Sequence, residues 1–161
     1  MTLDELNRTE PPAAADVLET CCGSRKWADG MAARRPFCAL AELHDAADCI
    51  WASLSREDWL EAFGSHPKIG ETSGASRWSK QEQAGVAIAA EDVRTRIARL
   101  NHEYKAQFGF IFIICATGKS AEEMLISLEQ RLVNSPEHEI RLAAEEQQKI
   151  IHLRLDKLIN R

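Results

Sequence analysis

Only one short segment of this chain has the composition of a β-strand, and it has no counterpart to pair with. The run from Phe110 to Ala116 lies between Gly109 and Gly118, is continuously apolar and is rich in β-branched residues. A single strand leaves its backbone N–H and C=O groups without hydrogen-bond partners. The sequence therefore predicts an extended, buried connector whose backbone groups are available to a polar ligand. Plain core packing with some helix is the alternative that this run leaves open.

The rest of the chain shows the apolar spacing of helices. Apolar residues recur every three or four positions from Leu40 to Leu54 and from Val93 to Phe108, which indicates one buried face on each helix. Serine caps, prolines and glycines mark the expected ends. We therefore predict an all-α fold, a single compact bundle of about seven or eight helices over residues 1–161. The expected helical segments are 13–22, 24–33, 40–54, 55–64, 93–108, 120–132 and 135–158, with a further helix start at Ser79.

Composition and charge narrow the classes of partner. The chain is 45% hydrophobic and 28% charged, and its net charge of −5 without a clustered basic face argues against nucleic acid. No apolar run approaches the roughly 20 residues that cross a bilayer, and the acidic first residues lack a signal core, so we expect a cytoplasmic protein. Five cysteines, an odd number, fit a reducing compartment. The five histidines include no i, i+4 pair, so no metal site is expected.

The segment from Gly64 to Gly70 presents one histidine in a tight loop. Pro67 directly follows His66 and biases it away from helix, so we expect the imidazole to be held on an extended backbone. Because histidine changes charge near neutral pH, a histidine held in this way is a candidate for proton transfer. The same pattern is also typical of a turn with a surface or packing histidine, and the loop by itself leaves both interpretations open.

A second polar segment, from Ser79 to Gly85, has the form of a helix start. Ser79 and Glu82 are spaced as a capping box, in which the glutamate bonds back to the serine N–H. The functional alternative is that the free N–H groups of this helix end attract an anionic or carbonyl-rich ligand, with the amide of Gln83 beside them. Glu82 would then keep His66 protonated or fix its tautomer. The two interpretations are compatible if the same helix start serves both as a cap and as a ligand site.

A third candidate is Arg154, which lies within an otherwise apolar stretch. Burying a cation is costly unless an anion meets it. The side chain either reaches out to water along its own stem or binds a carboxylate or urea-like group through paired hydrogen bonds. The sequence by itself does not choose between the two.

These segments occur in the order and spacing of one known family. They are Arg35-Pro36-Phe37, His66 to Gly70, Ser79 to Gly85, Leu100 to Tyr104, Phe108 to Ile114, Arg131-Leu132 and Ile150 to Leu155. From about Leu18 to Leu158 the chain resembles the 2-oxo-4-hydroxy-4-carboxy-5-ureidoimidazoline (OHCU) decarboxylases of urate degradation. The resemblance implies an all-α homodimer that converts the ureidoimidazoline into (S)-allantoin and CO2 without a cofactor or a metal.

The resemblance also implies roles for particular residues. In that family the histidine of the H-P-x-x-G loop is catalytic and the glutamate of the S-x-x-E-Q helix start assists, which corresponds to His66 and Glu82 here. Ile111 stands where the family often has proline, which bears on the shape of the connector and not on the chemistry. The residues expected to line the substrate are Pro67, Ser79, Lys80, Gln81, Gln83, Phe112, Ile113, Ile114, Cys115, Ala116 and Arg154.

Two other functional classes remain as alternatives. A non-catalytic helical module that binds a purine-derived ring or a partner helix would need the same pocket but would tolerate the loss of His66. A structural dimerisation domain would have no concave polar site. Its interfaces would use the four tryptophans, Trp27, Trp51, Trp59 and Trp78.

Overall fold

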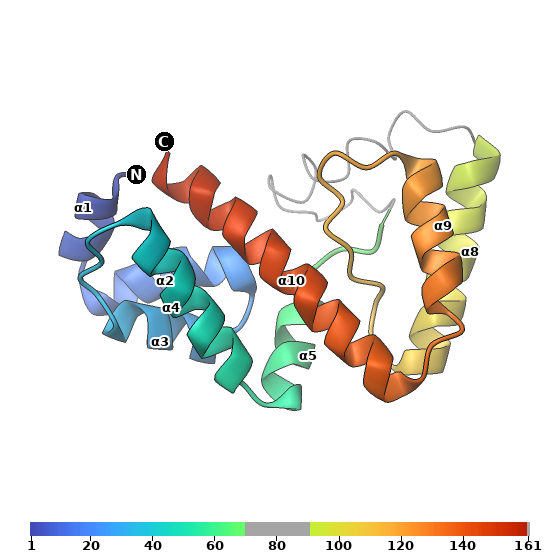
Figure 1. Cartoon of the computed structure of the whole chain (residues 1–161), viewed down its shortest axis with the longest axis horizontal. Coiled ribbons are helices and arrows are strands. Elements are labelled where there is room, and N and C mark those ends of the chain that lie inside the picture. The colour runs from blue at the N-terminus through green and yellow to red at the C-terminus, as the bar shows by residue number, and fades with distance from the viewer. Residues whose placement is uncertain (70–90, 161) are drawn as a thin grey trace. The chain divides into compact units, whose positions relative to one another are not determined.

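The computed structural model describes residues 1–69 and 91–160. These residues form eight helices and no strand (Figure 1), so the all-α prediction is confirmed. The chain divides into two compact units, one of Met1–Ala62 with Gln147–Arg161 and the other of Phe63–Glu146. The longest helix, α10 (Pro136–Ile159), supplies residues to both units.

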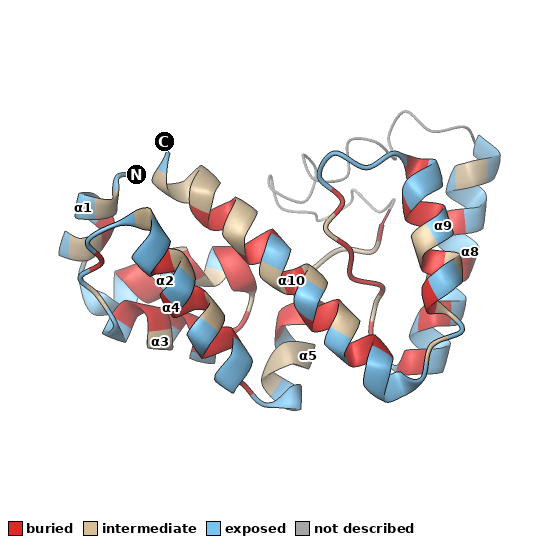
Figure 2. Ribbon diagram, viewed as in Figure 1, coloured by how far each residue is buried: buried red, intermediate tan, exposed pale blue. Residues whose placement is uncertain are grey.

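The first unit is built from short helices with their apolar sides turned inward (Figure 2). Leu18 and Leu155 are fully buried, and the indole N–H of Trp27 donates to the carbonyl of Ala47 over 3.1 Å. This bond ties two helices together through a side chain that is itself in the core. Besides the second half of α10, the unit contains α1 (Leu3–Arg8), α2 (Pro11–Cys22), α3 (Arg25–Ala33), α4 (Leu40–Ser53) and most of α5 (Arg56–Gly64).

The predicted helix ends agree with the structure to within two residues in this unit. Gly23 ends α2 with a φ of 82°, and Ser24 begins α3 by accepting from the Trp27 N–H. Helix α1 is missing from the sequence prediction, although Thr2 and Glu5 form a capping box at its start. With six residues and one buried side chain, α1 is too short to show a periodic apolar stripe.

The second unit contains α8 (Glu91–Phe108), α9 (Ala121–Arg131), the first half of α10 and the loop that follows α5. Gly109 ends α8 with a φ of 82°, and Ser120 caps α9 in a capping box with Glu123. Between α8 and α9, residues 111–116 form neither helix nor strand. The side chains of Ile111 and Cys115 are half-buried, and those of the other four residues are buried. The prediction of a buried, non-helical connector is confirmed.

The tryptophans of the described residues belong to the first unit. Trp27 and Trp51 are 0% and 3% exposed, and the half-buried Trp59 donates its indole N–H to the Trp51 carbonyl over 3.1 Å. Because Trp27 and Trp51 are core residues, the alternative in which they form a dimerisation surface is wrong for these two residues. Trp78 lies outside the described residues. None of the helices in the described ranges has the length and apolar content of a membrane-spanning segment.

Candidate functional site

The predicted catalytic histidine lies in the loop directly after α5. The backbone N–H of His66 donates to the carbonyl of Phe63 over 3.2 Å, which closes a turn at the helix end. His66 and Pro67 are half-buried, and Ile69, two residues further on, is only 7% exposed. The imidazole is therefore partly shielded from water on a backbone held at both sides, which suits a group that transfers a proton.

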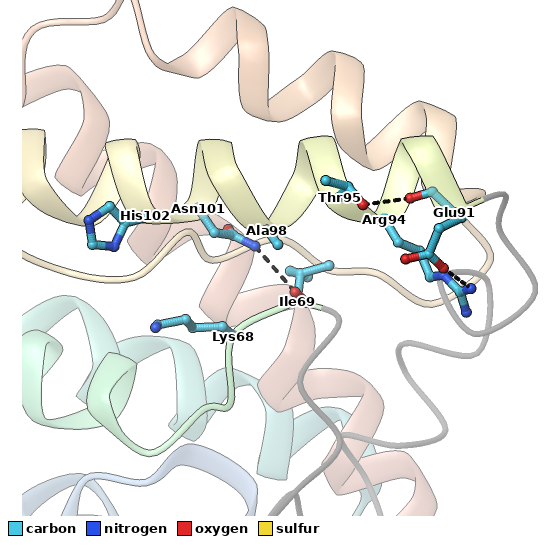
Figure 3. Close-up of a pocket in the computed structure, with 8 residues that line it drawn as sticks. All are labelled: Lys68, Ile69, Glu91, Arg94, Thr95, Ala98, Asn101 and His102. Carbon is cyan, nitrogen blue, oxygen red and sulfur yellow. Dashed lines mark hydrogen bonds and ion pairs between the residues drawn. The ribbon is translucent and has the colours of Figure 1, made fainter.

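A buried amide fastens the far end of this loop to α8. Asn101 is 3% exposed, and its Nδ2 donates to the carbonyl of Ile69 over 3.2 Å (Figure 3). Because a buried carbonyl that loses its donor costs free energy, this bond opposes movement of the loop. No local sequence pattern marks this role of Asn101, because its partner Ile69 is 32 residues away.

A pocket of about 640 Å³ lies beside this contact (Figure 3). Arg94 pairs with Glu91 over 2.6 Å, and the Thr95 hydroxyl donates to the Glu91 carbonyl over 2.8 Å, so these polar groups bond within their own helix. His66 is not among the described residues of its wall, and we therefore do not assign this pocket to the substrate. The wall is formed by Lys68, Ile69, Glu91, Arg94, Thr95, Ala98, Asn101 and His102.

The connector is held through its backbone. The carbonyl of Ile113 accepts from Nη1 of Arg131 over 2.5 Å, and the N–H of Cys115 donates to the carboxylate of Glu146 over 2.7 Å. The Ala116 carbonyl accepts from the N–H of Lys119 over 3.0 Å. The sequence predicts that the backbone groups of the connector are available to a ligand, whereas these three bond to the protein.

A buried ion pair orients Arg131. Glu139 is 0% exposed, and its Oε1 accepts from Nε of Arg131 over 2.6 Å and from the Tyr104 hydroxyl over 2.5 Å. Its Oε2 accepts from the Asn134 amide over 2.9 Å, so the buried charge is well satisfied. The guanidinium lies 4.7 Å from the centre of the Phe112 ring. Burial, opposed by the Arg131 charge and reinforced by the bond to Glu139, raises the pKa of Tyr104, which therefore remains a donor.

Aromatic contacts join the loop and the connector. The ring of Phe63, three residues before His66, lies 5.4 Å from the ring of Phe110. The ring of Tyr104 meets those of Phe110 and Phe112 edge-on, at 5.8 and 5.4 Å. The second unit thus brings two of the predicted segments together against α8.

The other predicted site residues are placed differently. Arg154 belongs to the first unit and is only 4% exposed, so the interpretation that it reaches out to water is wrong. Its Nη1 lies 3.5 Å from the carbonyl of Cys21. Burial raises the pKa of the neighbouring Cys22 thiol, which favours its uncharged form. The remaining predicted residues, Ser79, Lys80, Gln81, Glu82 and Gln83, lie outside the described residues.

Local sequence patterns also do not reveal the structural roles of the charged residues Arg131 and Glu139 at the connector. Glu139 precedes Ile140 on the buried side of α10, and Arg131 is the last residue of α9. A charged residue beside an apolar stripe is the signal that could have found them, because burying one requires a partner of opposite charge. The identity of that partner comes only from the packing of the helices.

Comparison with known proteins places the chain in a family. The family model described as OHCU decarboxylase matches residues 7–156. The uric acid degradation bifunctional protein TTL of Arabidopsis thaliana is 39% identical over 90% of this chain and 47% of that protein. The uric acid degradation bifunctional protein PucL of Bacillus subtilis is 31% identical over 98% of this chain and 33% of that protein. The chain therefore spans about half or less of the length of these two relatives. The 2-oxo-4-hydroxy-4-carboxy-5-ureidoimidazoline decarboxylase of Haloferax volcanii is 28% identical over 96% of this chain and 94% of that protein.

Solved structures agree with this placement. A crystal structure of OHCU decarboxylase in the presence of (S)-allantoin has a TM-score of 0.83 and 36% identity to this chain, covering 95% of this chain and 100% of that one. A crystal structure of (S)-allantoin synthase has a TM-score of 0.76 and 22% identity to this chain, covering 99% of this chain and 54% of that one. At this identity the match supports the fold alone. Since the family model extends over nearly the whole sequence, the chain belongs to the OHCU decarboxylase family.

Proposed function

We propose that this protein decarboxylates 2-oxo-4-hydroxy-4-carboxy-5-ureidoimidazoline to (S)-allantoin and CO2 in urate degradation, without a cofactor. The observation that carries the proposal is the match of the OHCU decarboxylase family model to residues 7–156. The held position of His66 in the second unit supports it, because the reaction needs a proton donor at a fixed place.

The chemistry sets three tasks for the protein. Breaking the bond between the ring carbon and the carboxylate releases CO2 and leaves two electrons on that carbon. A conjugated carbonyl of the substrate takes up this charge, and a proton then returns to one face of the carbon. The protein must orient and desolvate the carboxylate, stabilise the developing negative charge with fixed donors, and deliver that proton.

His66 is the proposed proton donor, and Glu82 sets its charge and orientation. General-acid catalysis of this kind typically accelerates a step by about 10² to 10⁴, or roughly 3 to 5 kcal/mol of barrier. Arg154 meets a substrate oxygen through its guanidinium. The proposed substrate contacts are those of Pro67, the segment Ser79, Lys80, Gln81 and Gln83, and the connector from Phe112 to Ala116.

The variant His66→Ala tests the central assignment. Turnover is measured on freshly generated substrate by the optical activity of the allantoin formed. We expect the variant to lose most of its turnover while its melting temperature stays close to that of the wild type. His138→Ala is the matched control, since His138 is exposed at the start of α10 and should leave the rate unchanged. Near-normal formation of (S)-allantoin by His66→Ala would remove this histidine from the mechanism. An inactive wild-type protein would instead favour the binding-module alternative.

Glu82→Gln separates the two roles of that carboxylate. A slower rate with little change in melting temperature would support a catalytic function. A lower melting temperature with an unchanged rate would leave Glu82 as a helix cap only.

The proposal includes a homodimer, which the family resemblance implies, and a cytoplasmic location, which the composition and the first residues of the sequence predict. None of the five cysteines is joined in a disulfide, which fits the reducing compartment that the odd number of cysteines predicts. Sedimentation velocity at assay concentrations tests the dimer, and a monomer that is fully active would contradict it. Fractionation of the source cells tests the location.

A further inference from the structure

The two backbone bonds of the connector lie on alternate residues. In an extended segment the N–H and C=O groups of one residue point to the same side, and those of the next residue point to the opposite side. Ile113 and Cys115 are two residues apart, and they bond to Arg131 of α9 and Glu146 of α10. In an extended backbone the N–H and C=O of the intervening Ile114 would point away from these two partners.

We propose that Glu146 and Arg131 are positioning residues for catalysis, which fix the rotation of the connector and thereby the direction in which Ile114 presents its backbone to substrate. The inference rests on the proposed function. A ureido or ring-amide group carries a carbonyl acceptor next to an N–H donor, which is the complement of the N–H and C=O of a single residue. Losing either anchor would let the segment rotate and misdirect these groups.

The two side chains that bond to the connector backbone, Arg131 and Glu146, differ in how many other bonds they make and in how deeply they are buried. Arg131 is bonded to Glu139 and to Tyr104 as well as to Ile113, so removing it would leave a buried carboxylate without its cation. Such a variant would unfold before it reported on the connector. Glu146 is half-buried and borders a pocket of about 340 Å³, so a side chain of equal length fits there without overpacking. Glu146 is therefore the residue to change.

Glu146→Met and Glu146→Gln form a matched pair. Glutamine keeps an oxygen that can accept from the Cys115 N–H, whereas methionine has similar length and no good acceptor. We expect Glu146→Met to lower kcat/KM about 10- to 100-fold, because a displacement of about 1 Å has an effect of this size. Glu146→Gln should remain close to the wild type, and the melting temperatures of both variants should be similar. The pH midpoint of kcat/KM should be the same in all three proteins, since the proton donor is untouched.

Hydrogen exchange of the full chain, measured by mass spectrometry on a peptide that covers residues 110–116, gives a readout that needs no turnover. The peptide should exchange faster in Glu146→Met than in the wild type and should remain protected in Glu146→Gln. Equal turnover and equal protection in all three proteins would overturn the inference, and so would a glutamine variant as impaired as the methionine variant. If the wild type has no decarboxylase activity, the proposed function fails, and the exchange rates still decide whether Glu146 holds the connector.

Discussion

Asn101 and Tyr104 lie three residues apart on α8, and each fastens one of the two segments that carry the candidate site in the second unit. The Asn101 amide donates to the Ile69 carbonyl at the end of the histidine loop. The Tyr104 ring packs against Phe112 of the connector, and its hydroxyl donates to Glu139, which orients Arg131. One side of α8 therefore sets how the loop and the connector are placed.

Asn101→Ala should loosen the histidine loop. The Ile69 carbonyl would lose its buried donor, so we expect the free energy of unfolding to fall by about 1 to 3 kcal/mol. The turnover rate should fall as well, because His66 is three residues away from the released carbonyl. Denaturant unfolding and the allantoin assay measure the two effects. Gln107→Ala is the control, since Gln107 is an exposed amide on the same helix that donates to the Leu132 carbonyl. Equal effects of the two variants would show that the loop does not depend on Asn101.

Tyr104 should resist ionisation in alkaline solution. Its pKa is raised above the ordinary value of 10.0, mainly by burial, so the phenol stays neutral in the folded state where an unfolded chain would ionise. The stabilisation from the buried neutral phenol is present in full below pH 10 and is lost progressively as the pH rises above that value. Tyr104 is the only tyrosine of the chain, so the ultraviolet absorbance of phenolate reports on it directly. The signal should appear together with the loss of helical circular dichroism. A phenolate in a still helical protein would contradict the buried bond to Glu139.

Gly109→Ala should destabilise the protein through its backbone alone. Gly109 has a φ of 82°, and an added Cβ would meet no atom within 4 Å, so the penalty is conformational and should be about 1 to 2 kcal/mol. Gly64→Ala is the matched control. Gly64 is the last residue of α5, has no positive φ and is equally open around its Cβ, so alanine there should be neutral or stabilising by up to about 1 kcal/mol. Thermal unfolding of both variants decides the matter, and an equal loss in both would argue against the left-handed turn.

Two histidines of the first unit should couple α4 to α10. The rings of His44 and His152 stack with their centres 4.4 Å apart, and each ring lies beside a carboxylate of the other helix, with His152 2.6 Å from Asp48 and His44 3.0 Å from Asp156. Because these side chains are partly exposed, a double-mutant cycle on His152 and Asp48 should give a coupling free energy of about 0.2 to 1 kcal/mol that shrinks with added salt.

The control for this cycle pairs His152→Ala with Asp45→Ala. Asp45 is an exposed carboxylate on α4 for which the described residues show no ion pair. Its cycle with His152 should be additive within experimental error. A coupling as large as that of Asp48 would indicate a general charge effect of α4 and not the crossed contacts.

The helices and the connector could be predicted because their signals are local. The capping box at Ser120, the left-handed glycine after α8 and the apolar spacing between Leu40 and Leu54 each involve residues a few positions apart, so they can be read from the sequence. The order of the motifs along the chain was sufficient to identify the family. Among the helices of the described residues, the six-residue α1 was missed, since a helix with one buried side chain shows no apolar periodicity.

The contacts that hold the candidate site came only from the tertiary structure. Asn101 and Ile69 are 32 residues apart, Arg131 and Ile113 are 18 apart, and Glu146 and Cys115 are 31 apart. Partners at such distances are chosen by how the helices pack, and no local spacing records that choice. The sequence by itself thus determined most of the helical segments and the family, and it predicted which residues carry the chemistry. The fold decided which backbone groups of those segments bond to the protein, because a buried polar group must find a partner wherever packing places one.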